Sequence, residues 1–430
     1  MLIKSLSLKD FKCFEQVDID FGKITLLTGA NSSGKSSLIY ALLGIMQSKY
    51  FPQYFALNGE LINMGGFDDV LRKKAENREF EISINMLSFF DNDPNNIETL
   101  WIENHDTQQP ELIYFKSNEG CIKINEQGKN HIDYQLIQDN DGYHFFNIED
   151  LKNSNPDIKV IEYNGDNEKI IKYQVTGVLK EPIGFFLNRY ANLSFEYHLE
   201  PFDIEDTKFN YIGSFRLPPE RTYYRKPKAG KIGVNGEGYI DQIIEWEESD
   251  KEKYEELIEA VIDMELFHSI QANKMKGGRF ELNVQVNEES ELASLTDVGF
   301  GISQFLPIIV ADIQMENNSC LAVSQPEIHL HPKIQATLGD YFCKQVNNTD
   351  KQYIIETHSE YLINRMRLLI VKGELQPEDV ALYFMENDGI KTTTHKIELT
   401  KDGQIKNAPQ GFFDTYEMDV MDIALYASAQ

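Results

Sequence analysis

The feature that most constrains this chain is a glycine-containing segment, Gly29 to Ser36, which fits the pattern G-x-x-x-x-G-K-[ST]. An apolar run typical of a buried strand precedes it at 24–27, and an apolar run with helical spacing follows it at 38–43. In that context, glycines let consecutive backbone N–H groups and a helix N-terminus point at one anion. Lys35 is suited to reach the β- and γ-phosphates of a nucleotide, and the Ser36 hydroxyl is suited to ligate Mg²⁺.

The segment therefore predicts a site for ATP with Mg²⁺, in which Ser36 is the metal ligand. A glycine-rich turn without a ligand is the alternative, and the strand before the segment and the helix after it argue against that alternative. The residues predicted to surround the phosphates are Gly29, Ala30, Asn31, Ser32, Ser33, Gly34, Lys35, Ser36 and Ser37.

The chain carries 41 Lys and Arg against 69 Asp and Glu, a net charge of −28. A surface of that sign repels nucleic-acid phosphates at long range and fits a basic protein partner better. One basic cluster with interleaved aromatic residues, 221–231, stays open as a local nucleic-acid patch, a solvated loop or a loop near the nucleotide. No apolar run is long enough to cross a bilayer, and four scattered cysteines fit reduced thiols, so we expect a cytoplasmic protein without a membrane partner.

Changes of pattern along the chain predict four segments. The second is rich in Asn, Asp and Glu, with alternating stretches between turn-forming clusters, as in an antiparallel β insertion. In the third, apolar residues between 239 and 270 recur at helical spacing, and no heptad pattern is long enough for a coiled-coil arm. The predicted segments are 1–74, the N-terminal part of an ATPase domain with the phosphate loop; 75–210, an acidic β-rich insertion; 211–290, a helical lobe; and 291–430, the C-terminal part of the ATPase domain.

Three motifs follow one another in the last third of the chain. The first contains glycines and precedes an apolar run, the second follows a short buried strand, and the third ends a strand with a histidine. They are Asp297–Gln304, Ser324–Pro332 and Tyr353–Ser359. With the phosphate loop, they indicate an ATP site built from both ends of the chain.

The order of these motifs resembles that of an ABC-type ATPase head: phosphate loop, signature segment, Walker B strand, D-loop and switch histidine. More specifically, 325–332, 356–360 and the ending 402–414 resemble bacterial AAA/ABC-type ATPases related to the overcoming-lysogenisation-defect proteins. Within them, the chain resembles the subgroup that ends in a short domain of unknown function. The resemblance covers 1–70 and 210–430, and it implies an α/β P-loop NTPase fold with a β-rich insertion and a helical lobe.

The resemblance also implies roles for individual residues. Such heads dimerise around two ATP molecules, each held by the phosphate loop of one chain and the signature segment of the other. Gly299, Gly301 and Ser303 would then face the γ-phosphate bound by the partner chain, at the start of a helix whose N–H groups favour an anion. His358 would sense the γ-phosphate as the switch histidine, and His329 and His331 would lie in the D-loop at the dimer seam.

Other interpretations of these residues stay open. His329 and His331 have the spacing of a metal pair, but no third ligand follows at a useful distance in the sequence, which argues against zinc. Gln47 and Gln53 are candidates for a Mg²⁺-contacting glutamine, and for Gln47 a place on the helix surface is the stronger interpretation. For His358 the alternative to the switch role is an ordinary structural histidine.

The chain departs from the ABC pattern at the end of the Walker B strand. Two acidic residues are expected there, one to hold Mg²⁺ through water and one to polarise the attacking water, whereas this chain has Ser324 and Gln325. Gln325 can orient a water but cannot accept its proton, and Glu327 is the nearest acid that could. The predicted catalytic residues are therefore Gln325, Glu327 and His358, and the predicted activity is slow ATP hydrolysis.

We expect an ATP-driven switch, a homodimer or higher homo-oligomer, that controls a protein effector in bacterial antiviral defence, with a nuclease as one candidate effector. The alternative is the ATPase head of a DNA-repair or nucleic-acid-processing complex. Nuclease activity in this chain is not expected, because the sequence after His358 is too short for the metal-binding domain of related nucleases. The pairs Asp91 with Asp93 and Asp139 with Asp141 read as solvated turns.

Overall fold

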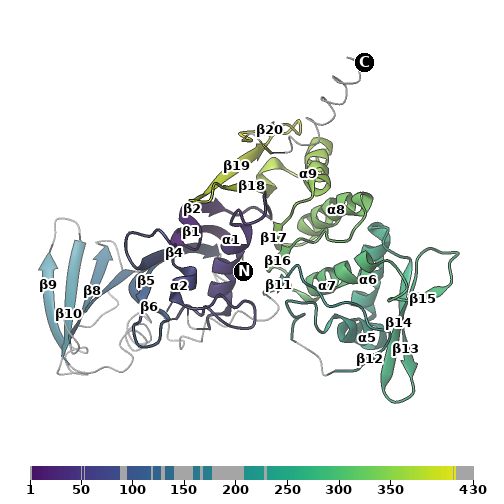
Figure 1. The fold of residues 1–430 in the computed structure, drawn as a ribbon, viewed down its shortest axis with the longest axis horizontal. Coiled ribbons are helices and arrows are strands. Elements are labelled where there is room, and N and C mark those ends of the chain that lie inside the picture. Colours follow the sequence, from purple (N-terminus) through teal and green to yellow (C-terminus); the bar gives the residue numbers. More distant parts are fainter. Residues whose placement is uncertain are drawn as a thin grey trace. The chain divides into compact units, whose positions relative to one another are not determined.

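The computed structural model describes residues 2–49, 51–52, 54–87, 94–117, 120–126, 131–139, 158–164, 168–176, 208–226, 230–409 and 411–412, and of 94–95, 117–176 and 300 it describes the backbone alone. The side chains of Gln53, Asp91, Asp93, Asp139, Asp141 and Asp414 lie outside this description. The chain forms two compact units, which we describe separately (Figure 1). Unit 1 comprises 1–2, 21–36 and 205–430, and unit 2 comprises 3–20 and 37–204.

A seven-stranded sheet is the frame of unit 1. Its strands lie in the order β11-β16-β17-β3-β18-β19-β20, in which the first five are parallel and the last two are added antiparallel. The central strands are buried along their whole length, which is why they read in the sequence as unbroken apolar runs. Their bounds are β11 Phe209–Ile212, β16 Cys320–Ser324, β17 Gln352–Glu356, β3 Ile24–Gly29, β18 Val380–Asn387, β19 Thr392–Leu399 and β20 Ile405–Lys406.

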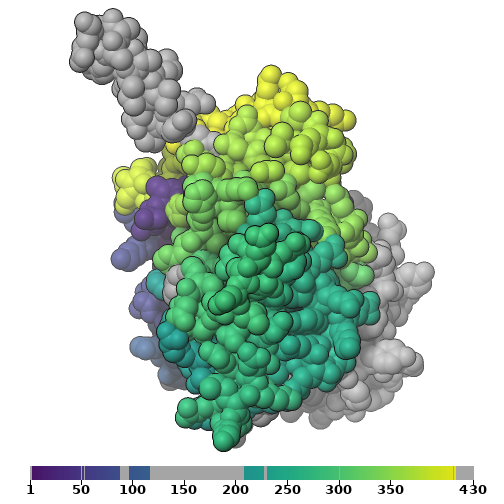
Figure 2. All heavy atoms as spheres, turned by 90° about the vertical axis from the view of Figure 1, so that its right-hand side faces the viewer, coloured from purple at the N-terminus to yellow at the C-terminus, as the bar shows by residue number. Residues whose placement is uncertain are grey.

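Helices and a small second sheet complete unit 1. α7 packs on α8 through Phe305 and Tyr341, and α8 packs on β17 through Phe342 and Tyr353, whose ring centroids lie 5.0 Å apart. In the space-filling view, the teal and green segments of this unit pack against one another on one face (Figure 2). The bounds are α5 Tyr239–Ser249, α6 Lys251–Asp263, α7 Phe300–Gln314, α8 Pro332–Asn348, α9 Glu360–Lys372 and the 3₁₀ turn η1 Pro377–Asp379, with the small sheet of β12 Tyr223–Tyr224, β13 Ser269–Met275, β14 Arg279–Gln285 and β15 Leu292–Ser294.

The helical pattern expected for 239–270 is correct only in part. Asp250 interrupts it, because its side chain accepts a hydrogen bond from the Lys253 N–H and so starts a second helix. That helix ends at Asp263, and the residues from Ser269 form a strand rather than more helix.

Unit 2 is built on a nine-stranded antiparallel sheet, in which β1 and β2, from the segment 1–74, are continued by strands from the segment 75–210. Its order is β2-β1-β4-β5-β6-β7-β8-β10-β9. An aromatic group packs on one end of this sheet, where the ring centroid of Phe55 lies 6.0 Å from Phe80 and 5.7 Å from Trp101. The bounds are β1 Ile3–Phe11, β2 Phe14–Asp20, β4 Glu79–Leu87, β5 Pro94–Glu103, β6 Pro110–Ser117, β7 Gly120–Glu126, β8 His131–Asp139, β9 Ile158–Asn164 and β10 Glu168–Thr176, and the helices are α1 Lys35–Gln47, whose first residues belong to unit 1, and α2 Phe67–Val70.

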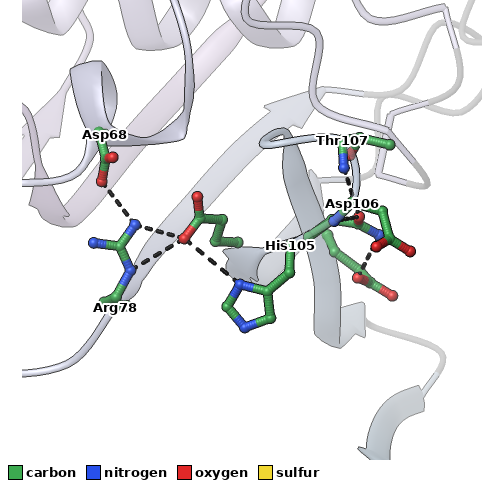
Figure 3. Close-up of polar contacts among 8 residues, drawn as sticks. Asp68, Arg78, His105, Asp106 and Thr107 are labelled. Carbon is green, nitrogen blue, oxygen red and sulfur yellow. Dashed lines mark hydrogen bonds and ion pairs between the residues drawn. The ribbon is translucent and has the colours of Figure 1, made fainter. Parts of the chain in front are cut away.

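Charged residues gather at one edge of unit 2, around the turn after β5 (Figure 3). Arg78 contacts Asp68 on α2 at 2.7 Å and Glu103 at the end of β5 at 2.5 Å, while His105 Nδ1 lies 4.0 Å from the same Glu103 carboxylate (Figure 3). The backbone N–H groups of the turn donate to the Asn104 side chain. These contacts fix the turn, and exposed ion pairs of this kind contribute little to stability.

Candidate nucleotide site

The phosphate loop connects β3 to α1 and depends on two glycines with positive φ. Gly29 has φ +134°, and a Cβ at this position would lie 2.1 Å from the Met385 carbonyl oxygen on β18. Gly34 has φ +107°, a conformation that L side chains rarely adopt. The loop thus turns sharply against the neighbouring strand before α1 begins at Lys35.

Lys35 lies folded over this loop. Its Nζ donates to the carbonyl oxygens of Gly29 at 3.0 Å and Ala30 at 2.7 Å, and only 3% of the residue is exposed. Burial lowers the pKa of Lys35, while the nearby carboxylates of Glu356 and Glu327 oppose that shift. A buried ammonium held by neutral carbonyls gains a stronger partner when an anion enters the loop, so this geometry suits phosphate binding.

Three strands lie in register beside the loop: β17 and β16 end there, and β3 continues to Gly29. Leu27 on β3 pairs with Glu356 on β17, which in turn pairs with Ser324 on β16. The backbone hydrogen bonds continue past the ends of β17 and β16. The Thr357 N–H donates to the Leu27 carbonyl oxygen, and the Gln325 N–H donates to the Glu356 carbonyl oxygen. The carboxyl ends of parallel strands meet at one edge of a sheet, and that edge is where such folds bind ligands.

Glu356 occupies the centre of this edge, and the sequence analysis did not single it out. Its Oε1 accepts a hydrogen bond from the Ser36 Oγ at 2.9 Å, and its Oε2 accepts one from the Ser324 Oγ at 2.9 Å. The residue is 5% exposed. The signal available in the sequence was an acidic residue at the end of the apolar strand 353–355, directly before the predicted switch histidine.

The oxygen atoms of Ser36 and Glu356 fit a magnesium ion, which prefers hydroxyl and carboxylate ligands and keeps several waters. Within the described residues, no group of three or more His, Cys, Asp or Glu side chains could hold a metal ion. The remaining ligands would therefore come from nucleotide phosphates and water, as in other phosphate-loop sites. When bound there, the ion would neutralise charge that develops on the phosphates.

Glu327 and His358 lie on either side of the same edge. The Glu327 Oε1 accepts the His358 backbone N–H at 2.6 Å, and its buried Oε2 has no hydrogen-bond partner among the described residues. Burial raises the pKa of Glu327. The His358 side chain is exposed in part, and its pKa is lowered by partial burial and by the Lys35 cation. Glu327 therefore offers a basic oxygen, and His358 a neutral imidazole, at the end of β17.

The segment after β16 is held by a buried arginine that the sequence analysis did not identify. Arg216 Nη2 donates to the carbonyl oxygens of Ser324 at 2.7 Å and Gln325 at 3.1 Å. Its Nε and Nη1 have no hydrogen-bond partner among the described residues, and burial lowers its pKa to about 10. Gln325 has φ +49°, so Arg216 fixes an unusual backbone turn at the predicted catalytic glutamine.

The three predicted signature residues have different environments. Gly299 is the N-cap of α7, is exposed, and has no atom within 4 Å of a hypothetical Cβ. A Cβ on Gly301 would lie 2.6 Å from the His329 carbonyl oxygen, so this glycine allows the helix to approach the D-loop of the same chain. Ser303 is completely buried. Of these three residues, Gly299 is the exposed one, with open space around it.

The D-loop histidines have local roles in the structure. His329 is exposed with φ +64°, and His331 is the N-cap of α8, where its Nδ1 accepts the Lys333 N–H at 3.3 Å. The side chains of the basic cluster are largely neutralised by acids, because Arg221 contacts Asp297 at 2.7 Å. The same holds for Arg225 with Glu248 at 2.9 Å and Lys226 with Glu237 at 2.8 Å.

Gln47 is not the surface residue that the sequence favoured. It is half-buried within unit 2, where its Nε2 donates to the Ala56 carbonyl oxygen at 2.7 Å. Its Oε1 accepts the N–H groups of Leu61 at 3.3 Å and Ile62 at 3.1 Å. The side chain therefore organises the loop after α1 through its own hydrogen bonds, a role that α1 periodicity alone does not reveal.

A phosphate loop between a buried parallel strand and a helix, with polar residues gathered at the same strand ends, defines an α/β P-loop ATPase head. Residues 1–363 match the model of the AAA ATPase domain family, and the chain belongs to this family. Residues 375–423, which follow α9 and include β18, β19 and β20, match a protein domain of unknown function, DUF3696. The expected P-loop NTPase fold and the short C-terminal domain are thereby confirmed.

A comparison with curated proteins finds no match. Among solved structures, the SMC head domain from Thermotoga maritima is 10% identical, with a TM-score of 0.43 over 93% of this chain and 100% of that one. An SMC head bound to the C-terminal winged-helix domain of ScpA is 12% identical, with a TM-score of 0.49 over 93% and 99%. An SMC head domain bound to the C-terminal domain of ScpA, derived from Pyrococcus furiosus, is 10% identical, with a TM-score of 0.45 over 98% and 99%. Similarities this distant carry no conclusion about activity or partners.

None of the helices within the described residues combines the length and apolarity needed to cross a bilayer.

Proposed function

We propose that this protein is an ATP-binding, slowly hydrolysing switch that forms a homodimer or higher homo-oligomer when ATP and Mg²⁺ are bound. The observation that carries the proposal is the edge where β17 and β16 end in register beside β3, with Lys35, Ser36 and Glu356 on it. This edge provides a cation for the phosphates and oxygen ligands for the metal.

The proposed slow turnover follows from the acids at this edge. Ser324 and Gln325 carry no charge, and one oxygen of Glu327 is held by the His358 N–H. Glu327 can still accept a proton on its second oxygen, while Gln325 orients the water and His358 contacts the γ-phosphate. A single base in a backbone hydrogen bond supports hydrolysis less well than a dedicated pair of acids.

ATP-dependent assembly is proposed from the exposed start of α7. Gly299 is exposed, with no atom within 4 Å of a hypothetical Cβ, and the N–H groups at the start of a helix favour an anion. If they contact the γ-phosphate held by a second chain, ATP binds the assembled state better than the separate chains and shifts the population toward it. The buried side chain of Ser303 places the contact on backbone groups near Gly299.

We further propose that assembly controls a protein effector in a bacterial defence system in the cytoplasm. The resemblance of the motifs to those of overcoming-lysogenisation-defect proteins supports this role, and the net charge of −28 favours a partner with a basic surface. The alternative, a head that processes nucleic acid, gains little from the basic cluster, because Arg221, Arg225 and Lys226 are paired with acids.

Light scattering of the full chain with and without ATP and Mg²⁺, together with phosphate release, tests the proposal. We expect ATP-dependent growth in mass with slow turnover, lost in Lys35→Ala because the loop loses its cation. Gly299→Glu places a negative charge at the start of α7 and should block assembly while ATP still binds. Val286→Glu, at an exposed position of the same unit, is the matched control and should assemble normally. Unchanged mass with ATP would refute the switch, and turnover stimulated by DNA would favour the alternative.

A further inference from the structure

The acid missing from the end of β16 has a counterpart one strand away. Within the described residues, Glu356 is the carboxylate that contacts the predicted metal ligand, with its Oε1 2.9 Å from the Ser36 Oγ. We propose that Glu356 performs the metal-ordering role that ABC-type heads assign to an acid at the end of the Walker B strand, and that Ser324 orients it. This inference rests on the proposed function, because it concerns how the same site holds its metal.

The direction of the hydrogen bond is the first argument. A serine hydroxyl has one proton to donate and two lone pairs. Because Ser36 donates its proton to Glu356, the lone pairs are left for a cation on the phosphate side of the loop. A carboxylate that fixes a ligand in this way also raises its basicity, as partners of metal ligands commonly do.

The burial and charge of Glu356 are the second argument. The residue is 5% exposed, and a buried carboxylate is costly unless cations and hydrogen bonds compensate it. Its Oε2 accepts the Ser324 Oγ at 2.9 Å, and Lys35 is the cation that acts on it in the structure. Lys35 is also the group that is expected to turn to the phosphates when nucleotide binds, and a divalent cation would then restore the balance of charge.

The strand register is the third argument. Ser324 and Glu356 are direct partners on β16 and β17, and β17 lies between β16 and β3. Moving an acid from the end of β16 to the end of β17 shifts it by one strand spacing, roughly 5 Å, toward the phosphate loop. Ser324 then takes a new part. Its hydroxyl contacts the Tyr211 OH at 3.1 Å and donates to Glu356. Ser324, which stands where ABC-type heads have an acid, therefore positions the carboxylate of the neighbouring strand.

The other acid at this edge is already committed elsewhere. Glu327 Oε1 is bound to the His358 backbone N–H at 2.6 Å, and no contact between Glu327 and Ser36 is found in the described structure. Glu327→Gln is therefore a matched control, since it removes a second buried carboxylate from the same edge without touching the predicted metal ligand.

The experiment measures how much metal strengthens nucleotide binding. The dissociation constant of a fluorescent ATP analogue is measured with the full chain in EDTA and in excess MgCl₂, and the ratio of the two constants is the metal's contribution. In Glu356→Gln we expect this ratio to fall roughly 10–100-fold, the usual effect of losing the partner of a metal ligand. Without metal, the same variant should bind the analogue equally well or more tightly, because a negative charge near the phosphates is gone. Ser324→Ala should lower the ratio in the same direction by a smaller factor, and Glu327→Gln should leave it unchanged.

The outcomes separate this inference from the proposed function. Wild-type protein that does not bind the analogue in either condition refutes the proposed function itself. Wild-type protein whose metal dependence persists in Glu356→Gln, or is lost in Glu327→Gln instead, overturns the role of Glu356 while the nucleotide site stands. Binding in EDTA shows that the loop of each variant is folded. If Glu356→Gln does not fold, Glu356→Asp takes its place: it keeps the charge but shortens the reach to Ser36, and an unchanged ratio would overturn the inference.

Discussion

A buried ion pair at the end of α7 should be one of the main supports of unit 1. Asp312 is completely buried and Lys351 is 6% exposed, with 3.3 Å between the Lys351 Nζ and an Asp312 carboxylate oxygen. The same carboxylate accepts the Tyr341 OH at 2.5 Å and the Tyr353 OH at 2.9 Å. Asp312 thus joins α7, whose other end carries the exposed Gly299, to α8 and β17.

Asp312→Asn keeps the shape of the side chain but removes the carboxylate that contacts the buried Lys351 ammonium, leaving only the weaker electrostatic influence of Glu256 among the described acids. Breaking a buried pair in this way costs about 3–5 kcal/mol. For a unit of this size, 1 kcal/mol corresponds to roughly 2–4 °C in the thermal midpoint, so we expect a fall of roughly 6–20 °C. The exposed pair of Lys344 and Glu259, whose side chains are 41% and 66% accessible, is the control, and Glu259→Ala should cost only about 0.2–1 kcal/mol.

Calorimetry gives the midpoints, and hydrogen exchange of peptides from α7, α8 and β17 locates the loss in unit 1. If the orphaned charge is the cause, Asp312→Asn combined with Lys351→Met should recover most of the stability, because an isolated buried cation no longer remains. A loss below about 1 kcal/mol in Asp312→Asn, or no recovery in the double variant, would refute the reasoning.

Three further predictions concern the site and its surroundings. Gln47→Ala removes three hydrogen bonds and should lower the free energy of unfolding by about 1–3 kcal/mol without changing the Mg²⁺ dependence of nucleotide binding. A changed dependence would indicate that Gln47 contacts the metal. Gly301→Ala would place a Cβ 2.6 Å from the His329 carbonyl oxygen and should lower the thermal midpoint by roughly 2–12 °C. Gly299→Ala, at a position with open space around it, should leave the midpoint unchanged. Equal midpoints for the two variants would contradict this packing. Glu327 must be ionised to accept a proton and burial raises its pKa, so turnover should rise with pH along a limb above its usual value of 4.5, and an identical limb in Glu327→Gln would exclude it as the base.

The sequence was sufficient to predict those elements whose pattern lies within one short segment. The phosphate loop was predicted because the strand, the glycines, Lys35 and the helix follow one another directly in the sequence, and the structure has them in that order. The strand at 320–324 and the helix after Gly299 were likewise readable from apolar runs next to turn residues. The helical prediction for 239–270 failed beyond Asp263. The spacing of apolar residues does not by itself show where a helix ends or where the helical period of 3.6 residues gives way to the strand period of 2.

The partners in the site could not be predicted, because they depend on strand register between distant parts of the chain. Ser36 and Glu356 are 320 positions apart and meet only when β3 and β17 pair. Arg216 reaches the turn after β16 across 108 positions, and nothing in its local sequence marks it as buried. Gln47 was misjudged for a different reason, since its partners come from a nearby loop without regular structure.

The chemistry of this edge depends on which strand carries the acid. A parallel sheet presents several strand ends at one edge, about 5 Å apart, so a carboxylate on any central strand can reach the first turn of the phosphate-loop helix. In this chain the apolar strand β17 ends in Glu356, and β16 ends in a serine that hydrogen-bonds to it. Such an exchange would preserve metal binding, which needs one acid next to Ser36. It would not replace the second acid of the usual pair, because Glu356 faces Ser36 and Ser324 and so leaves proton transfer to Glu327. Nucleotide binding and hydrolysis would then rest on different strands, and substitutions at Glu356 and Glu327 should separate them.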